Sequence, residues 1–97
     1  MIAGYDPKVV GGVEAQLEKF DEILAFLADA PETEAVISAQ EHLQFARSYL
    51  LGAMPEELEV SLAMAEKAIH GMDDCRLRQE SLRLLDEVRE ARATPMM

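Results

Sequence analysis

The 97-residue chain has little of what several classes of protein need. Its single cysteine excludes an internal disulfide and favours a reducing compartment, so we expect a cytoplasmic protein. No apolar run approaches the roughly 18–20 residues of a membrane span. The first residues also lack the cationic segment and long apolar run of a signal peptide. These absences predict a soluble protein that does not enter a membrane.

Basic residues are scarce. Nine Lys and Arg residues stand against nineteen Asp and Glu residues, which gives a net charge of −10. Direct binding of nucleic acid normally requires a basic patch that displaces counterions from phosphates, and anionic membrane surfaces attract basic segments. We therefore expect no direct contact with nucleic acid or with a membrane. An acidic surface suits a basic protein partner, or it only keeps the protein soluble.

Aromatic residues are few as well. Five of them, and no tryptophan, stand in a chain that is 49% hydrophobic, so leucine, alanine and methionine must supply most of the core. These residues favour helices, and no segment shows the two-residue alternation of a strand. The length suits one domain. We predict a single all-α domain over residues 1–97, a small antiparallel bundle of about four helices built from αα-hairpins.

Prolines and acidic residues mark the predicted helices. Asp6-Pro7 and Pro55 are typical helix starts, because aspartate caps free amide groups and proline suits the first turn. Pro31 separates the first two helices, since the residue before a proline resists helical geometry. The predicted helical ranges are 7–28, 32–52, 55–70 and 74–93, followed by a tail at 94–97.

Glycines and aspartates predict how these helices begin and end. The pair Gly11-Gly12 weakens the first helix, so we expect its regular part to begin after the pair. Gly71 is placed to end the third helix in a left-handed conformation. Asp73 or Asp74 is placed to cap the fourth helix.

Apolar residues repeat at alternating spacings of three and four, the pattern of a helix that packs along another helix. In the second helix small and large residues alternate on this stripe, which predicts a close approach to a neighbour. The stripes are Val10, Val13, Leu17, Phe20, Leu24 and Leu27 in the first helix, widened by Ile23 and Phe26; Val36, Ala39, Leu43, Ala46, Leu50 and Ala53 in the second; Leu58, Leu62, Ala65 and Ile69 in the third, helped by Met64 and Ala68; and Leu77, Leu84, Leu85, Val88 and Ala91 in the fourth.

The segment from Phe45 to Gly71 resembles one unit of the tetratricopeptide repeat in the positions of Tyr49, Gly52 and the pair Ala68-Ile69. Its second half is about three residues longer than in that repeat, and no second copy follows. The resemblance implies a helical hairpin, and we do not assign the chain to that family.

Residues 69–79 concentrate the groups that most often carry chemistry: a histidine, two aspartates, the only cysteine and two arginines. A di-metal bundle would need Glu-x-x-His motifs, and zinc would need more Cys and His ligands. A nucleophilic Cys75 would need a positioned base. We interpret the segment as a helix junction, with Glu66 and His70 as an ordinary helical pair. We predict no enzymatic activity, no metal and no cofactor; a ligand-binding or enzymatic bundle here is a third hypothesis.

Charge is divided unevenly along the chain. Residues 1–74 carry fifteen acidic and four basic side chains, whereas residues 75–97 carry four acidic and five basic ones, all five arginine. This division predicts ion pairing of the last helix with the acidic part, either within the fold or between subunits. It also fits ion pairs along the helix itself.

The leading functional hypothesis is a protein-interaction module, such as an adaptor, an assembly factor or a chaperone-like bundle. Methionine adapts to varied partner surfaces, and small bundles gain stability by association. We expect a protein partner and self-association, with a dimer favoured. The predicted interaction residues are the apolar Tyr49, Leu51, Met54, Met64 and Met72, expected to be exposed, and Arg76, Arg78 and Arg83.

The alternative hypothesis is an acidic inhibitor that mimics nucleic acid and binds a basic DNA- or RNA-binding protein, as a phage-encoded antagonist would. Its carboxylates would occupy the places that the target reserves for phosphates. The predicted acidic patch is Glu56, Glu57, Glu59, Asp73 and Asp74.

Overall fold

The computed structural model describes the backbone of residues 7–93 and the side chains of residues 13–92. Its four helices are α1 (Pro7–Ala28), α2 (Glu34–Leu51), α3 (Pro55–His70) and α4 (Cys75–Ala93). No strand occurs between residues 7 and 93. The predicted all-α bundle of four helices is therefore confirmed, while the tail at 94–97 lies outside the described residues.

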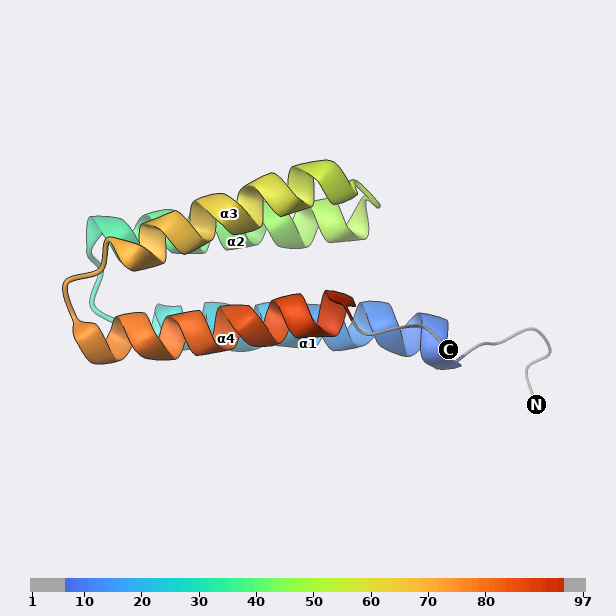
Figure 1. Cartoon of the computed structure of the whole chain (residues 1–97), viewed down its shortest axis with the longest axis horizontal. Helices are drawn as coiled ribbons and strands as arrows, with labels where there is room; N and C mark the ends of the chain where they lie inside the picture. Colours follow the sequence, from blue (N-terminus) through green and yellow to red (C-terminus); the bar gives the residue numbers. More distant parts are fainter. Residues whose placement is uncertain (1–6, 94–97) are drawn as a thin grey trace.

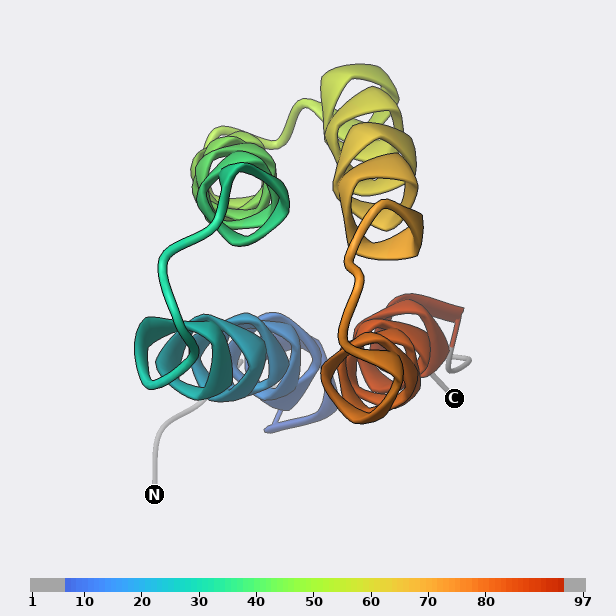
Figure 2. The same cartoon turned by 90° about the vertical axis from the view of Figure 1, so that its left-hand side faces the viewer.

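The helices form two layers of antiparallel pairs. In Figure 1 the α2/α3 pair lies above the α1/α4 pair, and each helix runs opposite to the one before it. Figure 2 looks along the bundle and shows the four helices at the corners of a square, with α4 returning beside α1. The structure measures 50 × 23 × 19 Å, so the bundle is elongated along its helices.

Side-chain caps fix two of the helix starts. The Thr33 hydroxyl accepts a hydrogen bond from the Val36 amide at 3.3 Å, so α2 begins at Glu34 rather than at the predicted residue 32. Asp74 accepts hydrogen bonds from the amides of Arg76 at 3.0 Å and Leu77 at 3.1 Å, which confirms the predicted cap of α4.

Two expectations about glycine are wrong. α1 runs from Pro7 straight through the Gly11-Gly12 pair. Gly71 ends α3 with φ −81°, in the right-handed region, because its amide still donates to the carbonyls of Lys67 and Ala68 as a helical residue would. A left-handed helix end does occur in the chain, but at Ala53, where φ is 54°.

The turn between α2 and α3 is therefore a Schellman motif that lacks its usual glycine. The Met54 amide donates to the Tyr49 carbonyl at 2.9 Å, and the Ala53 amide donates to the Leu50 carbonyl at 3.2 Å. Glycine stands one residue earlier, at Gly52, where φ is −87° and any residue is comfortable. A Cβ atom added to Gly52 would meet its nearest neighbour at 3.5 Å, an ordinary contact.

The core runs along the facing sides of the two layers. It consists of Phe20, Ile23 and Leu27 of α1; Val36, Ala39, Leu43 and Ala46 of α2; Leu58, Leu62, Ala65 and Ile69 of α3; Met72; and Leu84, Leu85 and Val88 of α4. The predicted stripes of α2 and α3 are therefore largely buried, although Leu50 is only half-buried, and Ala53 and Met64 are exposed.

The predicted stripe of α1 is only partly buried. Val13 is 41% exposed, and Leu17 and Leu24 are half-buried, whereas Ile23 is fully buried. The N-terminal part of α1 extends past the end of the α2/α3 pair (Figure 1), so the second layer does not cover the whole length of α1. Val10 lies outside the described side chains.

Small residues let α2 and α3 approach closely. Ala39 and Ala46 on α2 and Ser61 and Ala65 on α3 are all buried, and this pair of helices shares the largest interface in the bundle. Because helices pack closest where their contact residues are small, these four residues form the seam of the hairpin. We call them the small-residue seam.

Enlarging this seam should destabilise the fold. Ala65→Leu places three extra carbon atoms in filled space, so we expect the free energy of unfolding to fall by about 1–3 kcal/mol. Ala63→Leu adds the same atoms two residues away on the exposed side of α3, and we expect a change of less than about 0.5 kcal/mol. Urea denaturation measures both; equal losses would show that the seam is not tightly packed.

Exchanging Gly52 and Ala53 should stabilise the turn. The double variant Gly52→Ala with Ala53→Gly moves glycine to the left-handed position and keeps the composition of the unfolded chain unchanged. Removing the Cβ atom from a left-handed residue relieves about 1 kcal/mol, so we expect the free energy of unfolding to rise by that amount. A lower urea midpoint than in the wild type would contradict the positive φ at Ala53.

Candidate functional site

The exposed apolar side chains are the first guide to a binding surface. Of the predicted interaction residues, Leu51, Met54 and Met64 are exposed and Tyr49 is half-buried. Met72 is only 3% exposed, so its predicted exposure is wrong. The connection between α3 and α4 is short, and it turns this side chain inward until the Ser81 hydroxyl lies 4.0 Å from Met72 Sδ.

Two residues that were not predicted are among the most exposed apolar groups. Phe45 on α2 is 55% exposed and Val60 on α3 is 63% exposed. The Phe45 ring lies beside the His42 ring, with centroids 6.4 Å apart. Ile37 is also exposed, but it stands on the flank of α2 away from α3.

Two hollows lie between α2 and α3. The larger one, about 770 Å³, reaches from the middle of the two helices to the connections at their far ends, where Pro31 and Met72 line it. Its α2 wall is formed by Ala35, Ser38 and His42, and its α3 wall includes Met64, Lys67 and Ala68. The smaller one, about 290 Å³, lies near the turn between α2 and α3 and is lined by Tyr49, Glu56, Glu57, Val60 and Ser61.

Helical spacing places both hollows along one groove. On α2 the lining positions 35, 38, 42 and 49 follow spacings of three, four and seven, which keep them on one face, and Phe45 fills the gap between them. On α3 the lining positions 57, 61, 64 and 68 do the same. The core stripes point toward α1 and α4, so this face lies on the outer side of the hairpin. We call it the α2/α3 outer groove.

Both ends of the groove are acidic. Glu56 and Glu57 line its end near the turn, and Glu34, Asp73 and Asp74 line the opposite end. Lys67 is the basic residue among the lining side chains. The two acidic ends are separated by the 16-residue helix α3, about 24 Å at 1.5 Å per residue. The predicted acidic residues therefore do not form one patch.

The arginines of α4 lie mostly in ion pairs within the fold. Arg89 pairs with Glu66, and Arg92 pairs with Glu59, so two long side chains connect α4 to α3. On the other side of the bundle, Arg47 of α2 reaches Asp21 of α1 at 3.0 Å. Each of these pairs joins one layer to the other. Glu59 is thus engaged away from the groove.

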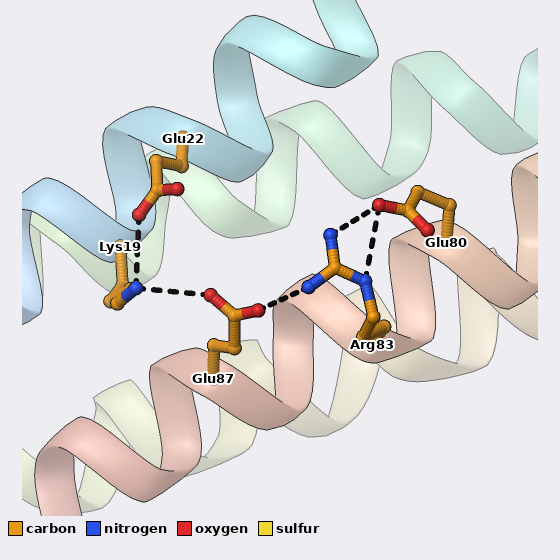
Figure 3. A network of polar contacts seen from close by, with 5 residues as sticks. All are labelled: Lys19, Glu22, Glu80, Arg83 and Glu87. Carbon is orange, nitrogen blue, oxygen red and sulfur yellow. Dashed lines mark hydrogen bonds and ion pairs between the residues drawn. The ribbon is translucent and has the colours of Figure 1, made fainter.

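A further ion-pair network ties α1 to α4. Lys19 lies 3.0 Å from Glu87 and 3.2 Å from Glu22, and Arg83 contacts both Glu87 and Glu80 (Figure 3). The hydrogen bond to Glu87 is the main cause that raises the pKa of Lys19, and the bond from Lys19 lowers the pKa of Glu87. Arg83, a predicted interaction residue, is therefore part of the internal network on the outside of the α1/α4 pair.

The remaining predicted arginines lie at the start of α4. Arg78 is half-buried and donates from Nη1 to the Met72 carbonyl at 2.9 Å, which holds the connection against the helix. Arg76 is exposed. Arg78 and Arg83 thus make contacts within the fold that help to stabilise it.

The segment 69–79 shows the contacts of a helix junction. His70 Nε2 lies 3.5 Å from Glu66 Oε2, as expected for a helical pair. Cys75 is exposed, and Gln79 Nε2 lies 3.4 Å from its Sγ atom. In the described part of the chain, no three His, Cys, Asp or Glu side chains are grouped so that they could hold a metal ion. None of the helices described is both long enough and apolar enough to span a membrane.

Comparison with protein-family models, curated proteins and solved structures gives no match to this chain. The function is therefore inferred from the groove and its charges.

The Glu66–Arg89 pair predicts a specific pH dependence. The hydrogen bond from Arg89 is the main cause that lowers the pKa of Glu66 below 4.5. A lowered pKa in the folded state adds stability above pH 4.5 that disappears as the pH falls through the folded pKa. Because the pair is partly exposed, Glu66→Gln should cost at most about 1 kcal/mol at pH 7. The difference from the wild type should shrink as the pH falls through the lowered pKa of Glu66.

Urea denaturation of the two proteins between pH 7 and pH 3 checks this dependence. Glu41→Gln, which removes a carboxylate from the exposed surface of α2, controls for the change in net charge. A difference between wild type and Glu66→Gln that grows as the pH falls would contradict the ion pair.

Proposed function

We propose that this protein is a non-enzymatic protein-interaction module that binds its partner through the α2/α3 outer groove. Adaptors, assembly factors and chaperone-like bundles act in this way. The observation that carries the proposal is the exposed apolar side chains along this face: Met64 lines the larger hollow, Val60 lines the smaller one, and Phe45 lies on α2 beside His42. Isolated exposed apolar residues are normal on a protein surface, but a row of them along a concave face is typical of a binding site.

The walls of this groove are built to keep their shape. The small-residue seam beneath it is buried, and the core residues of α2 and α3 are fixed against the second layer. A preformed groove costs a partner less ordering free energy than one that must assemble on binding. Met64 supplies a flexible apolar side chain that adapts to the partner surface.

Self-association remains part of the proposal and rests on a different surface. Leu51 and Met54 are exposed at the turn between α2 and α3, and a homodimer would cover them. The alternative, an acidic inhibitor that mimics nucleic acid, has less support, because the carboxylates are divided between two ends and Glu59 is paired with Arg92. The single cysteine favours the cytoplasm as the proposed location.

A pair of double variants tests the proposed binding surface. Phe45→Ser with Val60→Ser removes the apolar row of the groove, whereas Ile37→Ser with Leu51→Ser removes the same number of exposed apolar residues elsewhere. All four side chains are exposed, so both variants should fold. We expect capture of a partner from the native host to fall at least about tenfold for the groove variant only, as for loss of apolar anchors.

Light scattering on the same proteins gives the oligomeric state. A dimer that the second variant alone dissociates would place self-association at the surface near Leu51. Equal capture by the wild type and the groove variant would contradict the proposed function.

A further inference from the structure

We infer that the partner segment is an amphipathic α-helix with an apolar stripe along its middle and basic residues at both ends. This inference rests on the proposed function and names the chemistry of the partner. The groove lies between two antiparallel helices that run side by side, and neither wall is a strand edge with which an extended peptide could pair. Such a groove accepts a helix laid along it.

The middle of the groove is apolar. Phe45 stands one turn from His42 on α2. On α3, Met64 lines the larger hollow together with His42, and Val60 lines the smaller hollow together with Tyr49. Ser61 of the small-residue seam lines the smaller hollow, so a partner side chain meets a small residue there. Leucine or methionine at spacings of three and four on the partner would meet these residues.

The ends of the groove carry carboxylates that the fold does not use in ion pairs. Glu34, Asp73, Glu56 and Glu57 have no salt bridge to any basic side chain among residues 13–92. By contrast, Glu59, Glu66 and Glu87, on the side that faces α4 or α1, are all paired. These carboxylates keep the ends of the groove negative, although exposed carboxylates elsewhere, such as Glu41 and Asp86, are also outside these salt bridges. Lys67 is the one Lys or Arg side chain that lines either hollow.

This distribution distinguishes the partner from a second copy of the chain. Two outer grooves facing each other would bring like charges together at both ends, which disfavours association. Two of the arginines of α4 that could neutralise such carboxylates, Arg89 and Arg92, are engaged with α3 of their own chain. A separate basic helix meets neither obstacle.

The groove also sets the length of the partner helix. The lining positions on α2 run from Glu34 to Tyr49, a separation of fifteen residues, or about 22 Å at 1.5 Å per residue. A partner helix of about four turns would therefore place its two ends over the two acidic ends. Its dipole would favour neither orientation strongly, because both ends of the groove are negative.

Synthetic peptides test this inference with the full chain. The probe is a labelled 16-residue peptide with leucine at helical spacings of three and four, alanine elsewhere and two lysines at each end. Its matched control carries glutamate in place of every lysine. Fluorescence anisotropy at low salt should show the basic peptide binding at least about tenfold more tightly than the acidic one. That preference should shrink as salt is added.

Variants of the protein locate the binding. Phe45→Ser with Val60→Ser should weaken the basic peptide about tenfold, and Val13→Ser with Ile37→Ser, which removes two exposed apolar side chains elsewhere, should leave it unchanged. Glu56→Gln with Glu57→Gln should weaken the basic peptide severalfold without affecting the fold, since both residues are exposed.

Equal binding of the basic and acidic peptides, or binding of neither, would overturn the basic-helix inference. A wild-type dimer that becomes monomeric only in the groove variant would also overturn it, because a second copy would then occupy the groove. A different result would contradict the proposed function: capture of the natural partner by the groove variant at the level of the wild type.

Discussion

The close packing of α2 against α3 determines which faces of these helices are buried and which are left for binding. Four buried small residues, Ala39, Ala46, Ser61 and Ala65, let the two helices pack as a tight hairpin. Their larger neighbours, such as Leu43 and Leu62, then point toward the second layer and form the core. The outer face of the hairpin is left with shallow hollows and an exposed apolar row, which is where the binding site is proposed.

The second layer is held by different forces. α1 and α4 contribute large core residues such as Phe20 and Leu85, and long charged side chains span from layer to layer. Exposed pairs of this kind add little stability each, so apolar burial carries the fold. Their larger effect is on charge: they neutralise Asp21, Glu59 and Glu66, whereas Glu34, Glu56, Glu57 and Asp73 at the groove ends are in none of the salt bridges among residues 13–92. The packing of the hairpin and the charges at its two ends thus both favour the α2/α3 outer groove as the binding site.

Much of the fold could be predicted because its signals are local. Pro55 and Asp74 fix helix starts through bonds within one turn, and the periodic stripes of α2 and α3 identify their buried faces. The groove could not be predicted in the same way, since Phe45 and Val60 meet only when two helices are placed side by side. Periodicity also does not reveal which residues of a predicted stripe stay exposed, as Val13 does, or how a short connection turns Met72 inward.

Methyl NMR can detect a basic amphipathic helix bound between α2 and α3. Titration of the isotope-labelled full chain with the lysine-ended peptide should shift the methyl signals of Val60 and Met64, on the groove. The signals of Val13 and Leu51, which are equally accessible but lie elsewhere, should stay in place. Shifts confined to Val13 and Leu51, with Val60 and Met64 unmoved, would contradict the account.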